Sequence, residues 1–236
     1  VFSKSTNAEI PGSTISWTSR MVFMDGKLLL GLPINPAGLT GQINLETDLS
    51  GGGFDGNIYM MGPMTRFSSG DPCDVMFVRS TDEGTTWSAP IKVNDDNSIT
   101  NNQWMATMAV APNGRIDAAW LDTRDAPGSD SSALYYAYSL DAGFTWSANE
   151  KLSDLFDPHV GYPNQDKLGD YFDMVSTNSG AHLAWAGTLN GEEDVYYSYI
   201  QPGVIAGVQT ETMGMEFAIY PNPTDGNLMV KVTEGS

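Results

Sequence analysis

The chain has 236 residues, and 29 acidic against 11 basic side chains give it a formal net charge of −18. A charge this negative argues against nucleic acid or an anionic membrane as a partner. The one cysteine, Cys73, excludes internal disulfides and is expected to be a small buried hydrophobe, and no apolar run is long enough for a transmembrane helix.

The N-terminal quarter of the chain carries few strand signals. Residues 1–13 are polar and predict no element. Residues 15–32 hold two apolar runs on either side of Asp25-Gly26, which predicts a two-stranded hairpin across a type I′ turn. Residues 33–56 are rich in Pro, Gly and Asn, so we expect a long loop there.

The pattern S-x-D-x-G-x-T-W occurs twice, at residues 80–87 and 139–146, each time after a strand-like run. In each copy the Asp side chain can accept hydrogen bonds from backbone N–H groups ahead of it, and the Gly supplies a positive φ. The Thr and Trp begin the return strand, so each copy predicts a structural β-hairpin that the Trp packs on the layer beneath. The fixed residues are Ser80, Asp82, Gly84, Thr86 and Trp87 in the first copy, and Ser139, Asp141, Gly143, Thr145 and Trp146 in the second.

Other segments repeat together with this pattern. Residues 75–78, 134–137 and 195–198 are expected to be equivalent strands, although no such hairpin follows the third. Four antiparallel strands in a repeated unit are typical of a β-propeller blade, so the sequence predicts an all-β fold. The expected equivalent positions in the preceding strands are Tyr59, Trp120 and Trp185.

At the two hairpins the chain resembles the sialidase-like β-propeller proteins that carry Asp-box (BNR) repeats. The resemblance implies that each Asp-box is a staple on the outer hairpin of a blade, away from the ligand face. It also implies a six-bladed ring. Residues 14–208 can supply roughly four of its four-stranded antiparallel blades at most. We therefore expect an incomplete ring, with its N-terminal part absent from this sequence.

The C-terminal part is different in kind. Residues 209–215 are expected to be a linker, and residues 216–236 contain Tyr-Pro-Asn-Pro-Thr-x-Gly-x-Leu. This motif resembles the start of the C-terminal sorting domain used by the type IX secretion system of Bacteroidota. The resemblance implies a small β-sandwich, contact with the secretion machinery, and a secreted or outer-membrane-surface protein. The alternative is a proline-rich turn before an ordinary strand.

Candidate ligand-binding residues lie where strands of the repeated units begin or end, which in a propeller is the central face. Asp122 and Arg124 follow one strand, and they could hold a ligand or form an ion pair that pins the loop. Asp170, Tyr171 and Asp173 precede another strand and offer carboxylates and an aromatic platform for a sugar or a hard cation. The alternative there is strand initiation with a capping Asp.

Calcium is the one cofactor that the residues suggest. The loop Asp95-Asp96-Asn97 is rich in oxygen ligands, but it lacks the ligand spacing of a calcium loop. The acidic side chains could equally serve only to keep the surface solvated. Of the two histidines, His159 lies in a loop, and His182 lies within a predicted strand and is expected to be a packed residue.

A sialidase mechanism needs an arginine cluster that grips a carboxylate, a Tyr–Glu nucleophile pair and an Asp general acid/base. The chain has five arginines, of which Arg79 directly precedes a repeated hairpin and Arg115 begins a strand. No catalytic residue is therefore assigned. We expect a glycan-binding or interaction scaffold whose partner is a glycan or a cell-surface polymer. The alternative is an active sialidase-type exo-glycosidase.

Overall fold

The computed structural model describes residues 1–203, 215–220 and 229–234, in two compact units, Val1–Pro202 and Gly203–Ser236. All the regular structure of these residues is β-strand, and every pair of named strands is antiparallel. The predicted all-β class is therefore confirmed. Within the described ranges, no helix could cross a membrane.

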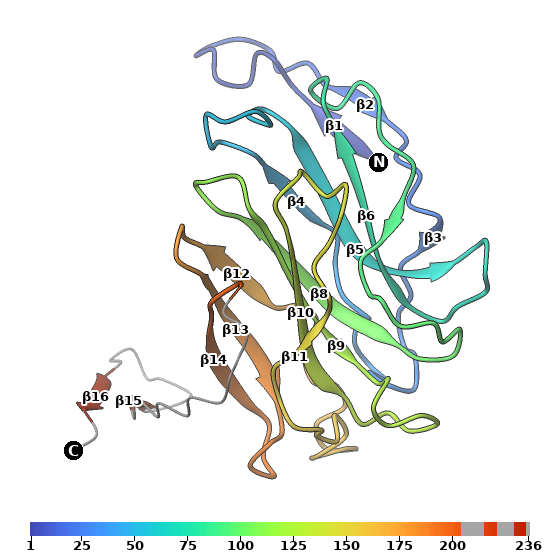
Figure 1. Ribbon diagram of the computed structural model, residues 1–236, viewed down its shortest axis with the longest axis vertical. Helices are drawn as coiled ribbons and strands as arrows, with labels where there is room; N and C mark the ends of the chain where they lie inside the picture. Colours follow the sequence, from blue (N-terminus) through green and yellow to red (C-terminus); the bar gives the residue numbers. More distant parts are fainter. Residues whose placement is uncertain (204–214, 221–228, 235–236) are drawn as a thin grey trace. The chain divides into compact units, whose positions relative to one another are not determined.

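Unit 1 contains four antiparallel sheets, I to IV, that follow one another in chain order (Figure 1). Sheet I pairs β1 (Phe2–Lys4) with β2 (Thr18–Arg20). In sheet II, β5 pairs with β3, β4 and β6, and β6 pairs with β7. The strands of sheet II are β3 (Gly26–Lys27), β4 (Asn44–Thr47), β5 (Ile58–Arg66), β6 (Asp74–Ser80) and β7 (Ile91–Lys92).

Sheets III and IV continue the series. The edge strands β4, β8 and β12 of sheets II, III and IV lie side by side, because β8 contacts both of the others. Sheet III contains β8 (Gln103–Val110), β9 (Ile116–Asp122), β10 (Ala133–Ser139) and β11 (Glu150–Lys151) in that order. Sheet IV contains β12 (Asp173–Ser176), β13 (Ala181–Gly187) and β14 (Asp194–Ile200).

Unit 2 contains one antiparallel pair, β15 (Met215–Tyr220) and β16 (Met229–Glu234). Most of the expected linker at 209–215 and nearly all of the expected sorting-domain motif at 220–228 lie outside the described residues. The expectation of a sorting domain therefore stays a prediction.

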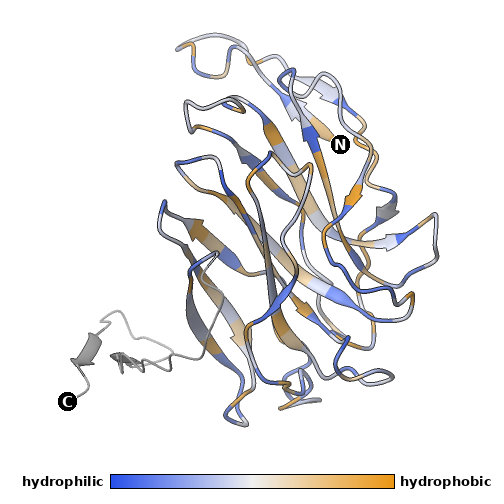
Figure 2. Ribbon diagram, in the orientation of Figure 1, coloured by the Kyte–Doolittle hydropathy of each residue, from blue (hydrophilic) through white to orange (hydrophobic). Residues whose placement is uncertain are grey.

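Three hydrophobic clusters fill the junctions between successive sheets of unit 1. Figure 2 shows the corresponding pattern along the chain, with hydrophobic segments in the strands and mostly hydrophilic loops. Burial of these side chains supplies the main driving force that holds one sheet on the next. Representative members of the three clusters are Phe2 and Met76, Phe77 and Trp120, and Leu121 and Trp185.

Cys73 is buried, as expected, with an exposed fraction of 1%. Its Sγ donates to the carbonyl oxygen of Gln103 at 3.1 Å. Burial raises the pKa of the thiol, and the charges of Asp71 and Asp74 raise it further. Cys73 is therefore a neutral packing residue rather than a thiolate nucleophile.

The two repeated hairpins have the same hydrogen bonds. In the first, Ser80 Oγ donates to Asp82 Oδ1 at 2.8 Å and accepts from Gly84 N at 2.8 Å. The Asp82 carboxylate then accepts from Thr86 N at 2.8 Å and Thr86 Oγ1 at 2.6 Å, and these bonds lower the pKa of Asp82 to about 2. The second hairpin repeats this set with Ser139, Asp141, Gly143 and Thr145.

Each hairpin glycine lies directly against an aromatic ring of the preceding sheet. A Cβ at Gly84 would stand 2.2 Å from a ring carbon of Phe2, and one at Gly143 would stand 2.2 Å from a ring carbon of Phe77. Both glycines also have a positive φ, of 79° and 76°. Glycine is therefore required twice over, for its backbone conformation and for the close approach of the ring.

The hairpin tryptophans complete this contact. Trp87 meets the ring of Phe2 edge-on, and Trp146 meets Phe77 in the same way, with ring centroids 5.3 Å apart in both pairs. Edge-to-face pairs of this kind add about 0.5–1.5 kcal/mol beyond the area they bury. The aromatic ring of one sheet thus sits between the glycine and the tryptophan of the next.

A third hairpin of the same kind, with an insertion, lies in sheet I. Ser5 Oγ donates to Asn7 Oδ1 at 2.9 Å, and Asn7 Oδ1 also accepts from Ser16 N at 3.0 Å. Ser5, Asn7 and Ser16 therefore correspond to Ser80, Asp82 and Thr86, and Trp17 corresponds to Trp87. Residues 1–13, which predicted no element, in fact contain β1 and most of this hairpin. The longer spacing and the Asn concealed the pattern.

The predicted hairpin around Asp25-Gly26 is wrong. Asp25 has φ 55°, but Gly26 pairs with Arg66 of β5, and residues 21–24 form no strand. The Asp25 carboxylate accepts from Arg66 Nε at 3.0 Å, so a long-range ion pair fixes this turn in place of a local return strand. The expected loop at 33–56 also contains a strand, β4.

The strand equivalence is right for two of the three aromatic residues and wrong for the third. Trp120 lies opposite Tyr135, and Trp185 lies opposite Tyr196 at the same position of the repeat. In sheet II this position is Gly62, which lies opposite Met76. Tyr59 lies three residues before Gly62 and pairs with Arg79, so it is not the equivalent of Trp120 and Trp185.

Replacing Gly143 with Ala is expected to destabilise unit 1 by about 2–4 kcal/mol, because the new methyl group meets Phe77 and the backbone is left-handed. The matched control is Gly128→Ala, at φ +79° with no atom within 4 Å of the new Cβ. It should cost only about 1–2 kcal/mol of backbone strain. Urea denaturation measures both, and equal losses would exclude a contribution from the contact with Phe77.

Candidate functional site

The predicted residues Asp122 and Arg124 lie at the edge of sheet III opposite its repeated hairpin. The hairpin joins β10 to β11, whereas Asp122 ends β9 and faces the start of β10 at Ala133. Since β9 and β10 are antiparallel, the loop after Asp122 and the hairpin after Ser139 lie at opposite ends of β10. The structural staple and the candidate residues are thus separated by the length of a strand.

Asp122 is fully buried and accepts four hydrogen bonds. Its Oδ1 accepts from Gln103 Nε2 at 3.1 Å and from the backbone N–H of Arg124 at 2.8 Å. Its Oδ2 accepts from Trp120 Nε1 at 2.9 Å and from Arg124 Nε at 2.8 Å. A buried carboxylate is tolerated when its acceptor positions are filled in this way, so Asp122 is satisfied within the protein.

Arg124 links this carboxylate to two other loops. Its Nη1 donates to Asp95 Oδ1 at 2.6 Å, and its Nη2 donates to Asn149 Oδ1 at 3.0 Å. The guanidinium carbon also lies 4.4 Å from the ring centroid of Tyr135. Burial disfavours the charged form, but the bonds to Asp122 and Asp95 outweigh it and raise the pKa of Arg124. Both predicted residues are therefore engaged in contacts between loops.

Polar contacts continue from Asp122 into sheet II. Asn94 donates to Gln103 Oε1 at 3.2 Å and to Asp74 Oδ1 at 2.8 Å. Asp71 lies beside this chain of contacts with 1% of its surface exposed. Burial raises the pKa of Asp71 to about 6, and the charge of Asp74 adds to the shift. Asp71 is thus a buried carboxyl group whose charge is poorly compensated.

Asp170, in the second predicted group, fastens two loops. Its Oδ1 accepts from the backbone N–H of Leu39 at 3.1 Å, and its Oδ2 forms an ion pair with Lys167. Asn35 makes a parallel connection by donating to the carbonyl oxygen of Gly169 at 2.8 Å. Among the described residues, no hydrogen bond or ion pair joins Asp170 to the pair Asp122–Arg124.

Tyr171 and Asp173, in contrast, lie on an exposed surface. Phe172 between them is buried and packs edge-on against Trp185, with ring centroids 6.5 Å apart. Successive side chains of an extended segment point to opposite sides, so Tyr171 and Asp173 share the open side. Tyr171 has 66% of its surface exposed.

A shallow recess of about 210 Å³ lies on this open face of sheet IV. His182 Nδ1 and the Tyr197 hydroxyl oxygen are 2.6 Å apart, and the two rings are stacked with centroids separated by 6.0 Å. Asp173 contributes a carboxylate at the margin. We define the exposed face of sheet IV by Tyr171, Asp173, Val175, His182 and Tyr197.

The expectation that His182 is a packed residue is wrong. In β13 the side chains of Ala181, Leu183 and Trp185 are buried, whereas His182 is only partly covered. The alternation of apolar residues in this strand could have revealed that His182 faces the other side. Tyr197, which is 58% exposed, was missed for the same reason.

Within the described ranges, no three His, Cys, Asp or Glu side chains gather so that they could hold a metal ion. Asp95, in the oxygen-rich loop, is instead bonded to Arg124 and to the backbone of Asn149. The expectation of calcium is not supported by this geometry and stays a prediction.

The sequence matches no protein-family model and no curated protein. Solved structures with a similar chain path include polysaccharide lyase Uly1 (18% identity, TM-score 0.45), a protein of unknown function from Dyadobacter fermentans (16%, 0.43) and the Hadza microbial sialidase Hz136 (16%, 0.43). The matches cover 82%, 79% and 67% of this chain but only 47%, 45% and 32% of those chains. The chain thus spans less than half of each, and similarity this low decides neither fold nor activity.

Replacing Asp122 with Ala is expected to destabilise unit 1 by about 3–5 kcal/mol, because the guanidinium of Arg124 and two other buried donors lose their acceptor. The control is Asp154→Ala, an exposed carboxylate, which should change stability by less than about 0.5 kcal/mol. Chemical denaturation measures both. A loss of ligand binding by Asp122→Ala at unchanged stability would contradict this structural role.

The raised pKa of Asp71 predicts a pH dependence of stability. The folded state binds the proton more tightly than the unfolded state, so the wild-type chain loses stability as the pH rises from about 4 through about 6. Asp71→Asn removes this loss and should be more stable at pH 8 by about 1–3 kcal/mol. Thermal melts between pH 4 and pH 8 test this, and parallel curves for the two proteins would refute it.

Proposed function

We propose that the protein is a glycan-binding β-propeller protein of the sialidase-like class, and that the exposed face of sheet IV holds the sugar. The supporting observation is the grouping there of a tyrosine ring, an imidazole ring and a carboxylate, from Tyr197, His182 and Asp173. Tyr171, two residues before Asp173, adds an exposed ring to this face.

The chemistry of this face suits a carbohydrate. Aromatic rings offer flat apolar surfaces to the C–H faces of a pyranose, and their polar ends remain available for hydrogen bonds. The Asp173 carboxylate can accept hydrogen bonds from sugar hydroxyl groups. A shallow recess of about 210 Å³ is suited to holding one sugar unit, either at the end of an oligosaccharide or within it.

The arginines favour binding over glycosidase activity. Three of the five guanidinium groups are committed to internal ion pairs: Arg66 with Asp25, Arg115 with Asp117, and Arg124 with Asp122. A cluster that grips a substrate carboxylate would need such groups to be free. A sialidase-type mechanism is therefore not proposed.

The proposal extends to architecture and export. Equivalent S-x-D-x-G-x-T-W hairpins within sheets II and III, each packed on the preceding sheet, support the assignment of sheets I to IV as blades of an Asp-box propeller. The motif at 220–228 supports export by a type IX system of Bacteroidota, to the medium or the outer-membrane surface. The partner would be a glycan or another cell-surface polymer.

Screening the full chain on a glycan array tests the function, with a fluorogenic sialoside assay as the test of catalysis. We expect array binding without turnover. Tyr171→Ala should weaken binding about tenfold, since one stacking surface is lost, without changing the melting temperature. Phe67→Ala, which removes another exposed aromatic ring, is the control and should bind normally. Turnover, or an unaltered affinity of Tyr171→Ala, would contradict the proposal.

A further inference from the structure

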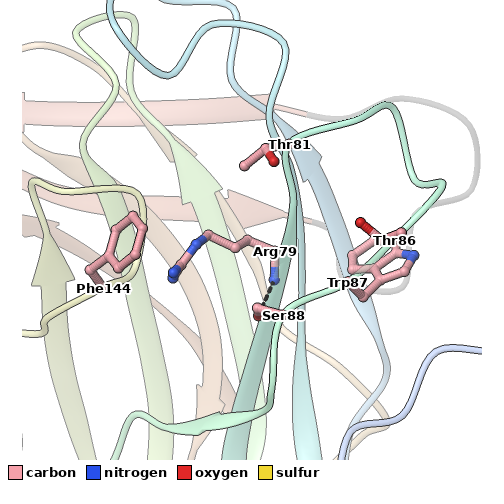
Figure 3. Close-up of a pocket in the computed structure, with 6 residues that line it drawn as sticks. All are labelled: Arg79, Thr81, Thr86, Trp87, Ser88 and Phe144. Carbon is pink, nitrogen blue, oxygen red and sulfur yellow. Dashed lines mark hydrogen bonds between the residues drawn. The ribbon is translucent and has the colours of Figure 1, made fainter.

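A second recess, of about 300 Å³, lies next to the repeated hairpins (Figure 3). Figure 3 shows Arg79 extending from its strand toward Phe144 of the second hairpin, while Thr86 and Trp87 of the first hairpin lie on the other side of Ser88. Since Arg79 belongs to sheet II and Phe144 to the hairpin of sheet III, the recess spans a junction between sheets. It does not involve the exposed face of sheet IV.

The internal repeat supplies a matched comparison for Arg79. Phe2 and Phe77 occupy equivalent positions, so Lys4 of sheet I corresponds to Arg79 of sheet II. Lys4 Nζ donates to Glu83 Oε2, in the next hairpin, at 3.2 Å. In the second hairpin the residue equivalent to Glu83 is Ala142, with nearly the same φ of 58° against 55°. Arg79 therefore faces a hairpin that lacks the carboxylate its counterpart has.

The guanidinium of Arg79 has no acceptor among the described residues. Its Nη1 is buried and unpaired, and its carbon atom lies 3.3 Å from the ring centroid of Phe144. Burial lowers the pKa of Arg79, and the nearby charge of Asp141 only partly offsets this effect. Three other arginines that are at least partly buried, Arg66, Arg115 and Arg124, each bond a carboxylate. Arg79 differs from them because no carboxylate among the described residues pairs with it.

Another group of the recess is also unsatisfied within the described part of the chain. Trp87 Nε1 is buried without an acceptor, as is its counterpart Trp146 Nε1 in the second hairpin, and the exposed Thr81 also borders the recess. A cation, a hydroxyl donor and two aromatic rings thus border a cavity at the lower end of the size range of small-molecule sites.

We propose that this recess binds an acidic monosaccharide unit, whose carboxylate pairs with Arg79 and whose ring lies against Trp87. The planar guanidinium can donate two parallel hydrogen bonds to a carboxylate. The nearest acidic group, Asp141, is already bonded to Thr145 and Ser139, so it does not compete for the guanidinium.

The test is a titration of the full chain with sodium glucuronate. The positions of the ¹⁵N indole signals of the six tryptophans in NMR spectra are measured at each glucuronate concentration. Loss of one signal in Trp87→Phe assigns the reporter. We expect the Trp87 signal to shift in the millimolar range, with a Kd of about 1–10 mM. Glucose and sodium acetate at the same concentration and ionic strength should leave it in place.

Arg79→Gln should weaken glucuronate binding at least about tenfold, as expected for the loss of one charge-assisted contact. Arg79→Lys keeps the charge but not the paired donors, so it should weaken binding less while remaining folded. Arg20→Gln, at an exposed arginine that bonds only a backbone carbonyl, is the matched control and should bind normally. The dispersion of the other indole signals reports folding in each variant.

Three results would overturn the proposal. They are an unmoved Trp87 signal, an equal response to glucose or acetate, and equal binding by Arg79→Gln and wild type in spectra that show folded protein. Because the recess and the exposed face of sheet IV share no residue, Tyr171→Ala should leave the glucuronate response intact. Failure of one site therefore says nothing against the other.

Discussion

The fold of unit 1 depends on the contact between a hairpin glycine and an aromatic ring of the preceding sheet. Gly84 on Phe2 and Gly143 on Phe77 allow an approach that any side chain would block. The Ser–Asp–Thr hydrogen bonds hold each hairpin in the one shape that presents this glycine. Because the ring lies between glycine and tryptophan, the contact fixes how sheet II packs on sheet I and how sheet III packs on sheet II.

The other strand ends are held together by charges rather than by rings. In a chain of net charge −18, the buried carboxylate of Asp122 is stabilised because an arginine and neutral donors surround it. These bonds tie the loops of sheets II and III to each other. On the exposed face of sheet IV, by contrast, the side chains of Tyr171 and Tyr197 stay exposed.

Features that depend on interactions between residues close in sequence could be predicted, and features that depend on residues far apart in sequence could not. The hairpins at 80–87 and 139–146 were predictable because their hydrogen bonds stay within eight residues. The turn at Asp25 was not, because Arg66 decides it from a distant strand. For Asp122 and Arg124 the sequence left a ligand site and an ion pair open, because residues that bond them, Gln103, Asp95 and Asn149, lie in other segments. His182 is a different case. The alternation of buried and less buried residues along its strand indicates that it faces away from the core, but a histidine within a strand was expected to be packed.

The third hairpin has a consequence for how such a chain can change. Asn7 bonds Ser16 across nine positions, whereas Asp82 bonds Thr86 across four, yet the flanking strands form an antiparallel pair in both. The hydrogen bonds to the carboxylate or amide oxygen close the base of the hairpin in both cases, although the loops beyond them differ in length. Extra residues can therefore be added at these tips without disturbing the sheets, and foreign peptides grafted there would be displayed on an unaltered frame.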